Sequence, residues 1–221
     1  AEKGCILYFQ NHGSDLTPSL KFAGFLEADG KMLLTPNWPI AELPRGKPGE
    51  VYKADYLAIP CVCDWDGDGD PDLLAGGFVT GRIFLFENGG NRPDGTPELK
   101  ARGPLRSAGK PIDTGWAAAP VAVDLDHDGD LDLICGAKPM TADGGDTSDK
   151  NGNLLYFKNV GTRRHPKLEQ HPFPRNAPPP TGTTVMAPAC DWNGDNLPDL
   201  LLVTRGSMPL YPIPNIGTRD R

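Results

Sequence analysis

Short runs of apolar residues, each bounded by glycine, proline, asparagine or aspartate, recur along the whole chain. The runs are rich in β-branched or aromatic side chains, as in 5–9 and 83–86. Runs of this kind, with turn-forming residues on both sides, are typical of β-strands. No segment carries a sustained apolar period of 3.6 residues with caps at both ends. We therefore expect an all-β protein with few helices.

The polar segments between these runs also repeat. An acidic segment occurs three times, at 64–72, 124–132 and 191–199, and its copies align without gaps. A second motif, an apolar strand that ends in Phe-x-Asn or a degenerate form of it, recurs four times. Its copies begin at Gly4, Gly81, Gly152 and Leu210. A Thr-Pro or His-Pro marker follows the first three copies. Repeats of about 65 residues that hold four short strands are typical of β-propeller blades.

The order of these motifs predicts strand 1 before each acidic segment, strand 2 after it, strand 3 at Phe-x-Asn and strand 4 after the proline marker. The chain then divides into strands 3 and 4 of a first blade with a connection (1–56), two whole blades (57–116 and 117–184), and strands 1 to 3 of a last blade (185–221). This amounts to about three four-stranded antiparallel blades, whereas propellers close with about four to eight. We expect a partial ring, completed by the rest of the propeller or by a second copy.

The pattern Asp-x-Asp/Asn-Gly-Asp-Gly-x-x-Asp-Leu, followed by a Gly-x-x-x-Phe-x-Asn strand, resembles the FG-GAP/VCBS repeat. Repeats of that family build calcium-binding propellers in integrin α-subunits, bacterial surface proteins, some lectins and some polysaccharide lyases. The resemblance extends over essentially the whole chain. It implies a propeller fold and bound Ca²⁺, and it says much less about activity.

Alternate aspartates in a tight loop bring several carboxylates to one point, and Ca²⁺ takes six to eight oxygen ligands. The resemblance implies about three ions, one for each loop. The ligands that it implies in the first loop are Asp64, Asp66, Asp68, the Asp70 carbonyl and Asp72. Those in the second are Asp124, Asp126, Asp128, the Asp130 carbonyl and Asp132. Those in the third are Asp191, Asn193, Asp195, the Leu197 carbonyl and Asp199.

The third loop departs from the pattern, because Asn193 lowers its charge and Asn196 replaces the turn glycine. We expect this loop to bind its ion more weakly than the others. We expect the ions to be structural rather than catalytic, and Mg²⁺ fits less well because it keeps its waters. An alternative stays open, in which the aspartates only form Asx-turns and bind nothing.

Composition and charge limit the classes of partner that this protein can have. The net charge is −7 and thirteen of the 29 acidic residues fall in the three loops, which argues against a nucleic-acid partner. No apolar run approaches the length of a membrane-spanning helix. The five cysteines show no framework spacing, and Cys63 and Cys190 occupy equivalent positions that suggest a small buried side chain. The spacing leaves a disulfide among the five cysteines as an open alternative.

Two aromatic residues, Tyr56 and Trp116, stand at equivalent positions, four residues before a proline that recurs ahead of the acidic segments (Pro60 and Pro120). They are candidates for a sugar-stacking rim, with Lys53 and Arg205 as polar contacts. The equal alternative is that both aromatics pack between blades.

We expect an extracellular, periplasmic or cell-surface binding or adhesion module for a glycan or a protein, since weak calcium sites suit a calcium-rich compartment. One alternative is a polysaccharide lyase that acts on uronic-acid polysaccharides, with Tyr56 beside Lys53 or Arg205 in its site. The other is a structural assembly subunit whose exposed blade edges pair. The chain holds no serine-hydrolase, zincin or phosphate-loop motif.

Overall fold

The computed structural model describes residues 5–33, 58–138, 154–173, 185–186, 189–204, 211–215 and 217. Within these ranges the chain forms strands, turns and irregular segments, and no helix is present. A helix with the length and apolarity to cross a membrane is therefore also absent from this part of the chain. The all-β fold class predicted from the sequence is confirmed.

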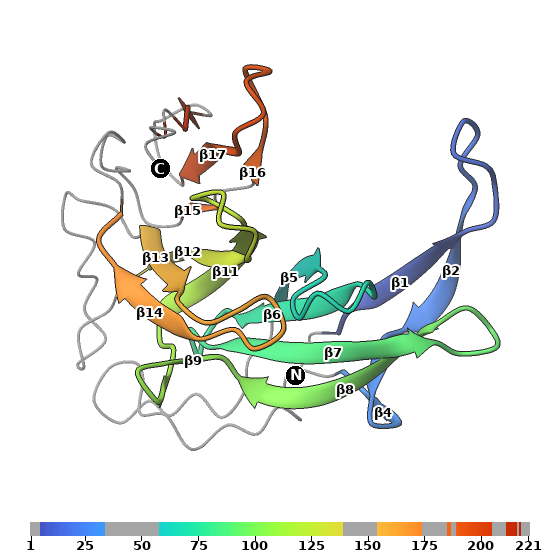
Figure 1. Ribbon diagram of the computed structural model, residues 1–221. Helices are drawn as coiled ribbons and strands as arrows, with labels where there is room; N and C mark the ends of the chain where they lie inside the picture. Colours follow the sequence, from blue (N-terminus) through green and yellow to red (C-terminus); the bar gives the residue numbers. More distant parts are fainter. Residues whose placement is uncertain are drawn as a thin grey trace.

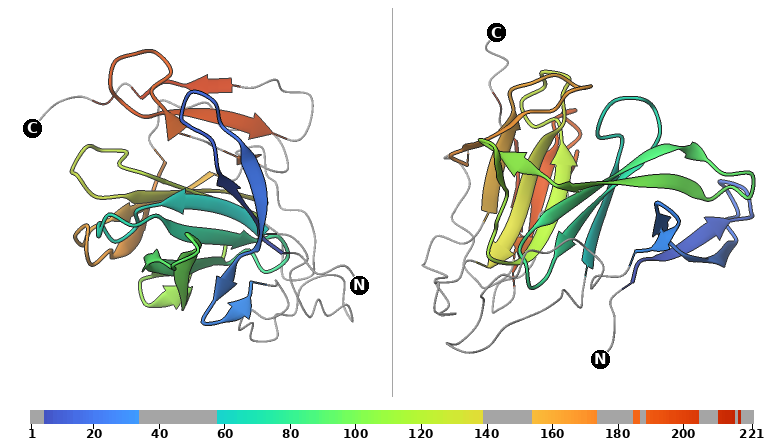
Figure 2. Two further views of the ribbon diagram at one scale, coloured as in Figure 1. Left: turned by 90° about the vertical axis from the view of Figure 1, so that its right-hand side faces the viewer. Right: turned by 90° about the horizontal axis from the view of Figure 1, so that it is seen from below.

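Four sheets follow one another in chain order, and we call them blades 1 to 4 (Figures 1 and 2). Blade 1 consists of β1 (Leu7–Asn11) and β2 (Leu20–Phe25). Blade 2 contains β5 (Ala58–Cys63), β6 (Asp72–Gly77), β7 (Ile83–Asn91) and β8 (Pro97–Pro104). Blade 3 contains β11 (Trp116–Val123), β12 (Asp132–Lys138), β13 (Leu154–Asn159) and β14 (Leu168–His171). Blade 4 contains β15 (Val185–Met186), β16 (Ala189–Cys190), β17 (Asp199–Thr204) and β18 (Tyr211–Ile213).

The four strands of blades 2 and 3 are antiparallel neighbours in sequence order. Each acidic segment joins the first strand of a blade to the second, and each Phe-x-Asn motif lies on the third strand, as the sequence predicted. This arrangement is that of a partial β-propeller. The exact division into 1–56, 57–116, 117–184 and 185–221 stays a prediction.

A short hairpin extends blades 2 and 3 from four strands to six, which the sequence analysis did not predict. The hairpin β3 (Glu27–Ala28) and β4 (Lys31–Met32) follows blade 1 and pairs in parallel with β8 of blade 2. The hairpin β9 (Arg106–Ser107) and β10 (Lys110–Pro111) follows blade 2 and pairs with β14 of blade 3 in the same way. At these two junctions the chain after strand 4 of one blade pairs with strand 4 of the next blade and so fastens the two blades together.

Apolar side chains fill the spaces between successive blades. One core cluster lies between blades 2 and 3 and includes Trp65, Leu74, Phe157 and Leu168. A second cluster joins blade 1 and the β3–β4 hairpin to blade 2, and a third joins blade 3 to blade 4. Alternate residues of β6 and β7 contribute to the clusters on opposite faces of the blade, because successive side chains of a strand point to opposite sides.

Candidate metal centres in the acidic loops

The three acidic loops turn at the same two positions, the fourth and the sixth. Gly67 and Gly69 have positive φ in the first loop, His127 and Gly129 in the second, and Gly194 and Asn196 in the third. The sixth position was expected from its glycine, whereas His127 at the fourth is a non-glycine residue with φ of 59°. The fourth position therefore adopts the left-handed conformation in all three loops, and in the second loop the exposed His127 adopts it without being a glycine.

The last aspartate of each loop, the ninth residue, is buried and fastens the loop to strand 3 of the same blade. Asp72 accepts hydrogen bonds from the backbone N–H groups of Trp65 (2.8 Å) and Asn88 (2.7 Å). Asp132 accepts from the backbone N–H of Asn159 (2.8 Å) and from the Tyr156 hydroxyl (3.0 Å). Burial raises the pKa of both carboxyls, and these donated hydrogen bonds lower it.

Asp199 repeats the arrangement in blade 4, with the backbone N–H groups of Trp192 (2.9 Å) and Asn215 (2.6 Å) as donors. These three aspartates were predicted only as metal ligands. Their hydrogen bonds show that they also fasten the acidic loop and the start of strand 2 to the end of strand 3 in the same blade.

The asparagine of the Phe-x-Asn motif holds the turn between strands 3 and 4. The side-chain oxygen of Asn159 accepts from the N–H groups of Gly161 (3.0 Å) and Lys167 (2.9 Å). Asn11 does the same in blade 1, with Gly13 (2.9 Å) and Ser19 (2.9 Å) as donors. The same offsets of two and eight residues establish that the two turns are structurally equivalent.

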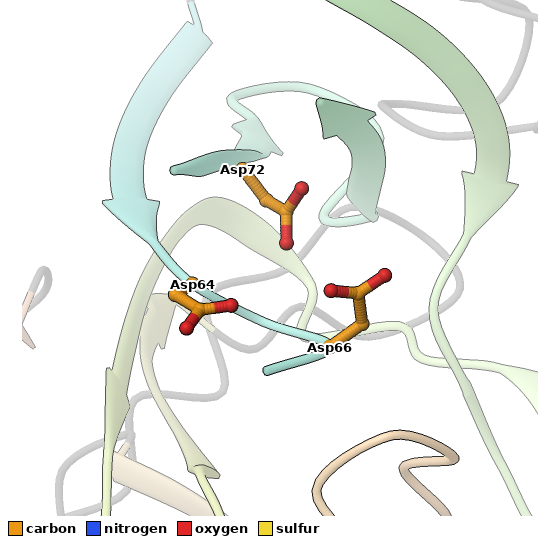
Figure 3. Close-up of side chains that lie close together, drawn as sticks. All are labelled: Asp64, Asp66 and Asp72. Carbon is orange, nitrogen blue, oxygen red and sulfur yellow. The ribbon is translucent and has the colours of Figure 1, made fainter. Parts of the chain in front are cut away.

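In the first loop, Asp64, Asp66 and Asp72 point toward one another (Figure 3). Each offers an oxygen that lies within 4.8 Å of those of the other two. Oxygens that bind one Ca²⁺ at about 2.3–2.6 Å lie within about 5 Å of one another, so this spacing fits a single ion. Asp64 Oδ1 is buried and has no hydrogen-bond partner in the described part of the chain.

Charge around the first loop is mainly negative. Burial raises the pKa of the Asp66 carboxyl, and the negative charges of Asp68 and Glu87 raise it further. The nearby cation is Arg163, which comes from the β13–β14 turn of blade 3 and donates to the Asp64 carbonyl (3.0 Å) and Asp64 Oδ2 (3.2 Å). Two features favour glycine at position 67. Its φ is 71°, and a side chain there would collide with Arg163.

In the second loop, Asp124, Asp126 and Asp128 also have oxygens within 4.8 Å of one another. Here the Lys158 ammonium donates to Asp126 and lies 3.5 Å from Asp128. The hydrogen bond to Asp126 raises the pKa of Lys158. Lys158 is the middle residue of Phe-x-Asn on β13, and Glu87 occupies the equivalent position on β7. A cation on strand 3 of the same blade therefore faces the second loop, whereas a carboxylate occupies that position beside the first loop, whose cation comes from the next blade.

The third loop is exposed from Asp191 to Asn196. Asp191 accepts hydrogen bonds from three backbone N–H groups of the loop, those of Gly194 (2.7 Å), Asp195 (3.1 Å) and Asn196 (3.0 Å). The Asn193 amide donates to Asp195 (3.0 Å). Asx-type bonds also occur in the first loop, where Asp68 N–H donates to Asp66 (3.1 Å) and Asp70 N–H to Asp68 (2.9 Å). The turns expected of these aspartates therefore form, and in the first two loops the carboxylates also converge.

Comparison with known families agrees with this geometry. Residues 64–135 match the model of the FG-GAP-like repeat. The matched segment begins at the first aspartate of the first loop and ends in β12, so it contains two acidic loops and the strands between them. It covers about a third of the chain. Neither a search of curated proteins nor a search of solved structures returned a significant match.

The FG-GAP-like match and the fold together indicate a β-propeller-like binding module. The matched segment does not include the third acidic loop or blade 1. These parts are related to the family only because their motifs resemble those of the matched segment. The match does not identify which group of proteins with such repeats, integrin subunits, lectins or lyases, this chain resembles most.

The structure describes only one of the four candidate ligand-binding residues. Tyr56, Lys53 and Arg205 lie outside the described residues. Trp116 is half-buried at the start of β11 and meets Phe78 of blade 2 edge to face, with ring centroids 6.0 Å apart. This contact between blades is the packing role that the sequence left open. A sugar-stacking role for Trp116 stays a prediction.

All five cysteines are free. Cys63 packs against the core between blades 2 and 3, as its position suggested, and it shares a hydrogen bond with Cys61. That bond lowers the pKa of Cys61 to about 7 and raises the pKa of Cys63. Cys190, at the equivalent position of blade 4, is exposed. The difference arises because the face of blade 4 that carries Cys190 is not covered as that of blade 2 is.

Proposed function

We propose that this protein is a calcium-stabilised β-propeller segment that acts as an extracellular binding or adhesion module for a glycan or a protein. The observation that carries the calcium assignment is the first loop. Three carboxylates converge there within the span of one ion, and a buried Asp64 oxygen lacks a partner. A buried carboxylate oxygen without a donor is costly, and a divalent ion would satisfy it.

The geometry also supports a structural rather than a catalytic ion. The first loop connects β5 to β6, and its base is already fastened to β7 through Asp72. An ion there would link the outgoing end of strand 1 to the start of strand 2 and offset the repulsion among the aspartates. We expect about three ions per chain, with the first loop binding most tightly. Lys158 pairs with two carboxylates of the second loop, whereas Arg163 pairs with one carboxylate of the first. The third loop has only two carboxylates, Asp191 and Asp195, besides the buried Asp199.

Calorimetric titration of chelator-treated protein with Ca²⁺, and separately with Mg²⁺, tests the assignment. We expect binding of Ca²⁺ and a higher melting temperature with Ca²⁺ than with EDTA. Asp66→Asn should weaken the tightest site, whereas Glu98→Gln, which removes an exposed carboxylate outside the loops, should not. Identical melting curves in Ca²⁺ and EDTA, together with no heat of binding, would refute the proposal.

The binding role rests on the FG-GAP-like match and on the propeller-like arrangement of the four sheets. A screen of immobilised glycans in Ca²⁺, repeated in EDTA, would identify a glycan ligand. The matched variants are Trp116→Ala and Val62→Ser, of which only the first should weaken glycan binding if the aromatic rim is the site. Loss of binding in neither variant would place the ligand elsewhere.

The residues proposed for a lyase, Tyr56, Lys53 and Arg205, are outside the described part of the chain. A lyase would generate unsaturated uronate products that absorb in the ultraviolet. Absorbance gained on incubation with uronic-acid polysaccharides would therefore overturn the non-catalytic assignment.

The proposed extracellular location rests on the weak affinity of calcium-binding loops in extracellular modules, about 10⁻⁴–10⁻³ M. Dissociation constants below micromolar would remove that argument.

A further inference from the structure

Blade 1 exposes a cluster of large apolar side chains on the face that points away from blade 2. Phe9 of β1 and Phe22 of β2 have ring centroids 5.5 Å apart, and Phe22 and Phe25 are 5.8 Å apart. We define the blade 1 face as Leu7, Phe9, Leu20, Phe22 and Phe25, all of which are exposed. On the opposite side of this small sheet, Ile6 packs against the core shared with blade 2. Exposed apolar clusters of this kind mark interaction sites.

The molecule contains a covered copy of the same face. Phe157 and Leu168 of blade 3 occupy the repeat positions of Phe9 and Leu20, and the equivalent asparagine turns fix this correspondence. Phe157 and Leu168 are each 4% exposed, whereas Phe9 is 50% and Leu20 is 68% exposed. The pair in blade 3 is covered because it belongs to the core cluster between blades 2 and 3, together with Trp65.

Blade 4 presents the other half of that contact. Trp192 occupies the repeat position of Trp65, since both follow the first aspartate of an acidic loop and both donate to its last aspartate. Trp65 is 3% exposed and Trp192 is 61% exposed. Cys190 and Val203 are exposed on the adjacent strands of the same blade. Blades 1 and 4 stand at the two ends of the series of sheets (Figure 1).

We propose that two copies of this chain associate head to tail, with the Trp192 side of blade 4 on one copy covering the blade 1 face of the other. The contact would reproduce the packing of blade 2 against blade 3, for which both halves are present and uncovered. Each copy has four sheets, of which blade 1 has only two strands, so two copies bring eight sheets together. Propellers close with about four to eight blades, and a closed two-fold ring covers both faces of both copies. The proposal does not depend on the ligand or on the ion.

One element of the internal template differs at the proposed contact. In the template, Arg163 of blade 3 donates to Asp64 of the first loop. The equivalent residues at the proposed contact are Asp15, which lies four residues after Asn11 as Arg163 does after Asn159, and Asp191. Two carboxylates would then approach each other. Asp15→Arg should restore the ion pair and strengthen the association by about threefold to tenfold, as expected for a partly exposed pair that replaces a repulsion.

Sedimentation velocity from about 1 to 200 µM tests the proposal. We expect the mass to rise from 23.7 kDa to twice that value with concentration. Phe9→Ser and Trp192→Ser should each weaken the dimer at least tenfold, and Val62→Ser, which removes an exposed apolar side chain outside both faces, should leave it unchanged. Far-UV circular dichroism and the melting temperature of each variant check that it is folded.

A mixture of the Phe9→Ser and Trp192→Ser proteins distinguishes the geometry of the contact. Head-to-tail pairing leaves one intact contact in the mixed pair, so the mixture should associate more strongly than either variant alone. A monomer at every concentration would overturn the proposal. So would a dimer that only Phe9→Ser weakens, because the blade 1 face would then pair with itself, or larger species that persist in both variants.

Discussion

Asp72 allows the folding role of the acidic loops to be separated from their metal role. Its side chain is buried, and its two oxygens accept the backbone N–H groups of Trp65 and Asn88 at 2.8 and 2.7 Å. Asp72→Ala would leave two buried donors without an acceptor, at about 1–3 kcal/mol each. Burial raises the pKa of this carboxyl. The desolvation of its charged form therefore offsets part of the stabilisation that the two hydrogen bonds provide in the native protein. We therefore expect a net loss of about 2–4 kcal/mol in the free energy of unfolding.

The matched variant is Asp68→Ala in the same loop. Asp68 is exposed, and its carboxylate accepts from Asp70 N–H two residues later, so its loss without metal should stay within about 0.5 kcal/mol. Urea unfolding in EDTA and in Ca²⁺ is the assay. Asp72→Ala should be destabilised in both solutions, and Asp68→Ala in Ca²⁺ alone. Equal losses for the two variants in EDTA, or a loss below about 1 kcal/mol for Asp72→Ala, would refute the assignment of a metal-independent role.

Three further outcomes are expected. Lys158→Met should raise the calcium affinity of the second loop about tenfold, because a positive charge beside the ion is removed; competition of Ca²⁺ with a chelating dye would measure this. Tyr156→Phe should cost about 1.5–3 kcal/mol in urea unfolding, because it removes a buried hydrogen bond to the Asp132 carboxylate. Gly76→Ala should cost about 1–3 kcal/mol or more, because the added methyl group would meet the Ala118 carbonyl of the next blade; thermal unfolding that matches the unmodified protein would contradict this close approach.

The strands and the acidic loops were predictable because both depend on local sequence. The alternation of apolar and turn-forming residues located β5 and β6 on either side of the first loop, and the repeat transferred this assignment to the other blades. The spacing of the aspartates similarly indicated that Asp64 and Asp66 would face one point, and the structure places them so.

The sequence analysis did not predict the hairpins between blades, because each hairpin is stabilised by pairing with a strand that is distant in sequence. β9 and β10 are two residues each, and the Ala108–Gly109 turn between them has positive φ at both residues, as a type I′ hairpin requires. The earlier hairpin turns at Asp29–Gly30, and Asp-Gly is the usual signal for this turn. That signal could have located one hairpin, but its parallel pairing with β8 depends on how two blades pack.

Lys158 illustrates a different limit of sequence reasoning. The aspartates of the second loop match those of the first, so the sequence pattern predicted equivalent metal sites in the two loops. The difference lies 32 residues away from Asp126, at the middle position of Phe-x-Asn, where one blade has lysine and the other glutamate. Strand pairing brings that position over the loop, and only the folded arrangement shows which charge faces the carboxylates.

The hydrogen bonds within the loops also bear on how an ion would act. The base aspartate of each loop is already bonded to strand 3, and the loop N–H groups already bond to the carboxylates at positions one, three and five. The loops therefore reach their turned conformation through the chain itself, and the apolar clusters between the blades hold the sheets. An ion would add a cross-link to a formed loop, unlike a zinc finger, in which the metal supplies the folding free energy. Removal of calcium should consequently lower the melting temperature while the circular dichroism of the β-sheets persists below it, and a chain that unfolds on addition of EDTA at room temperature would contradict this reasoning.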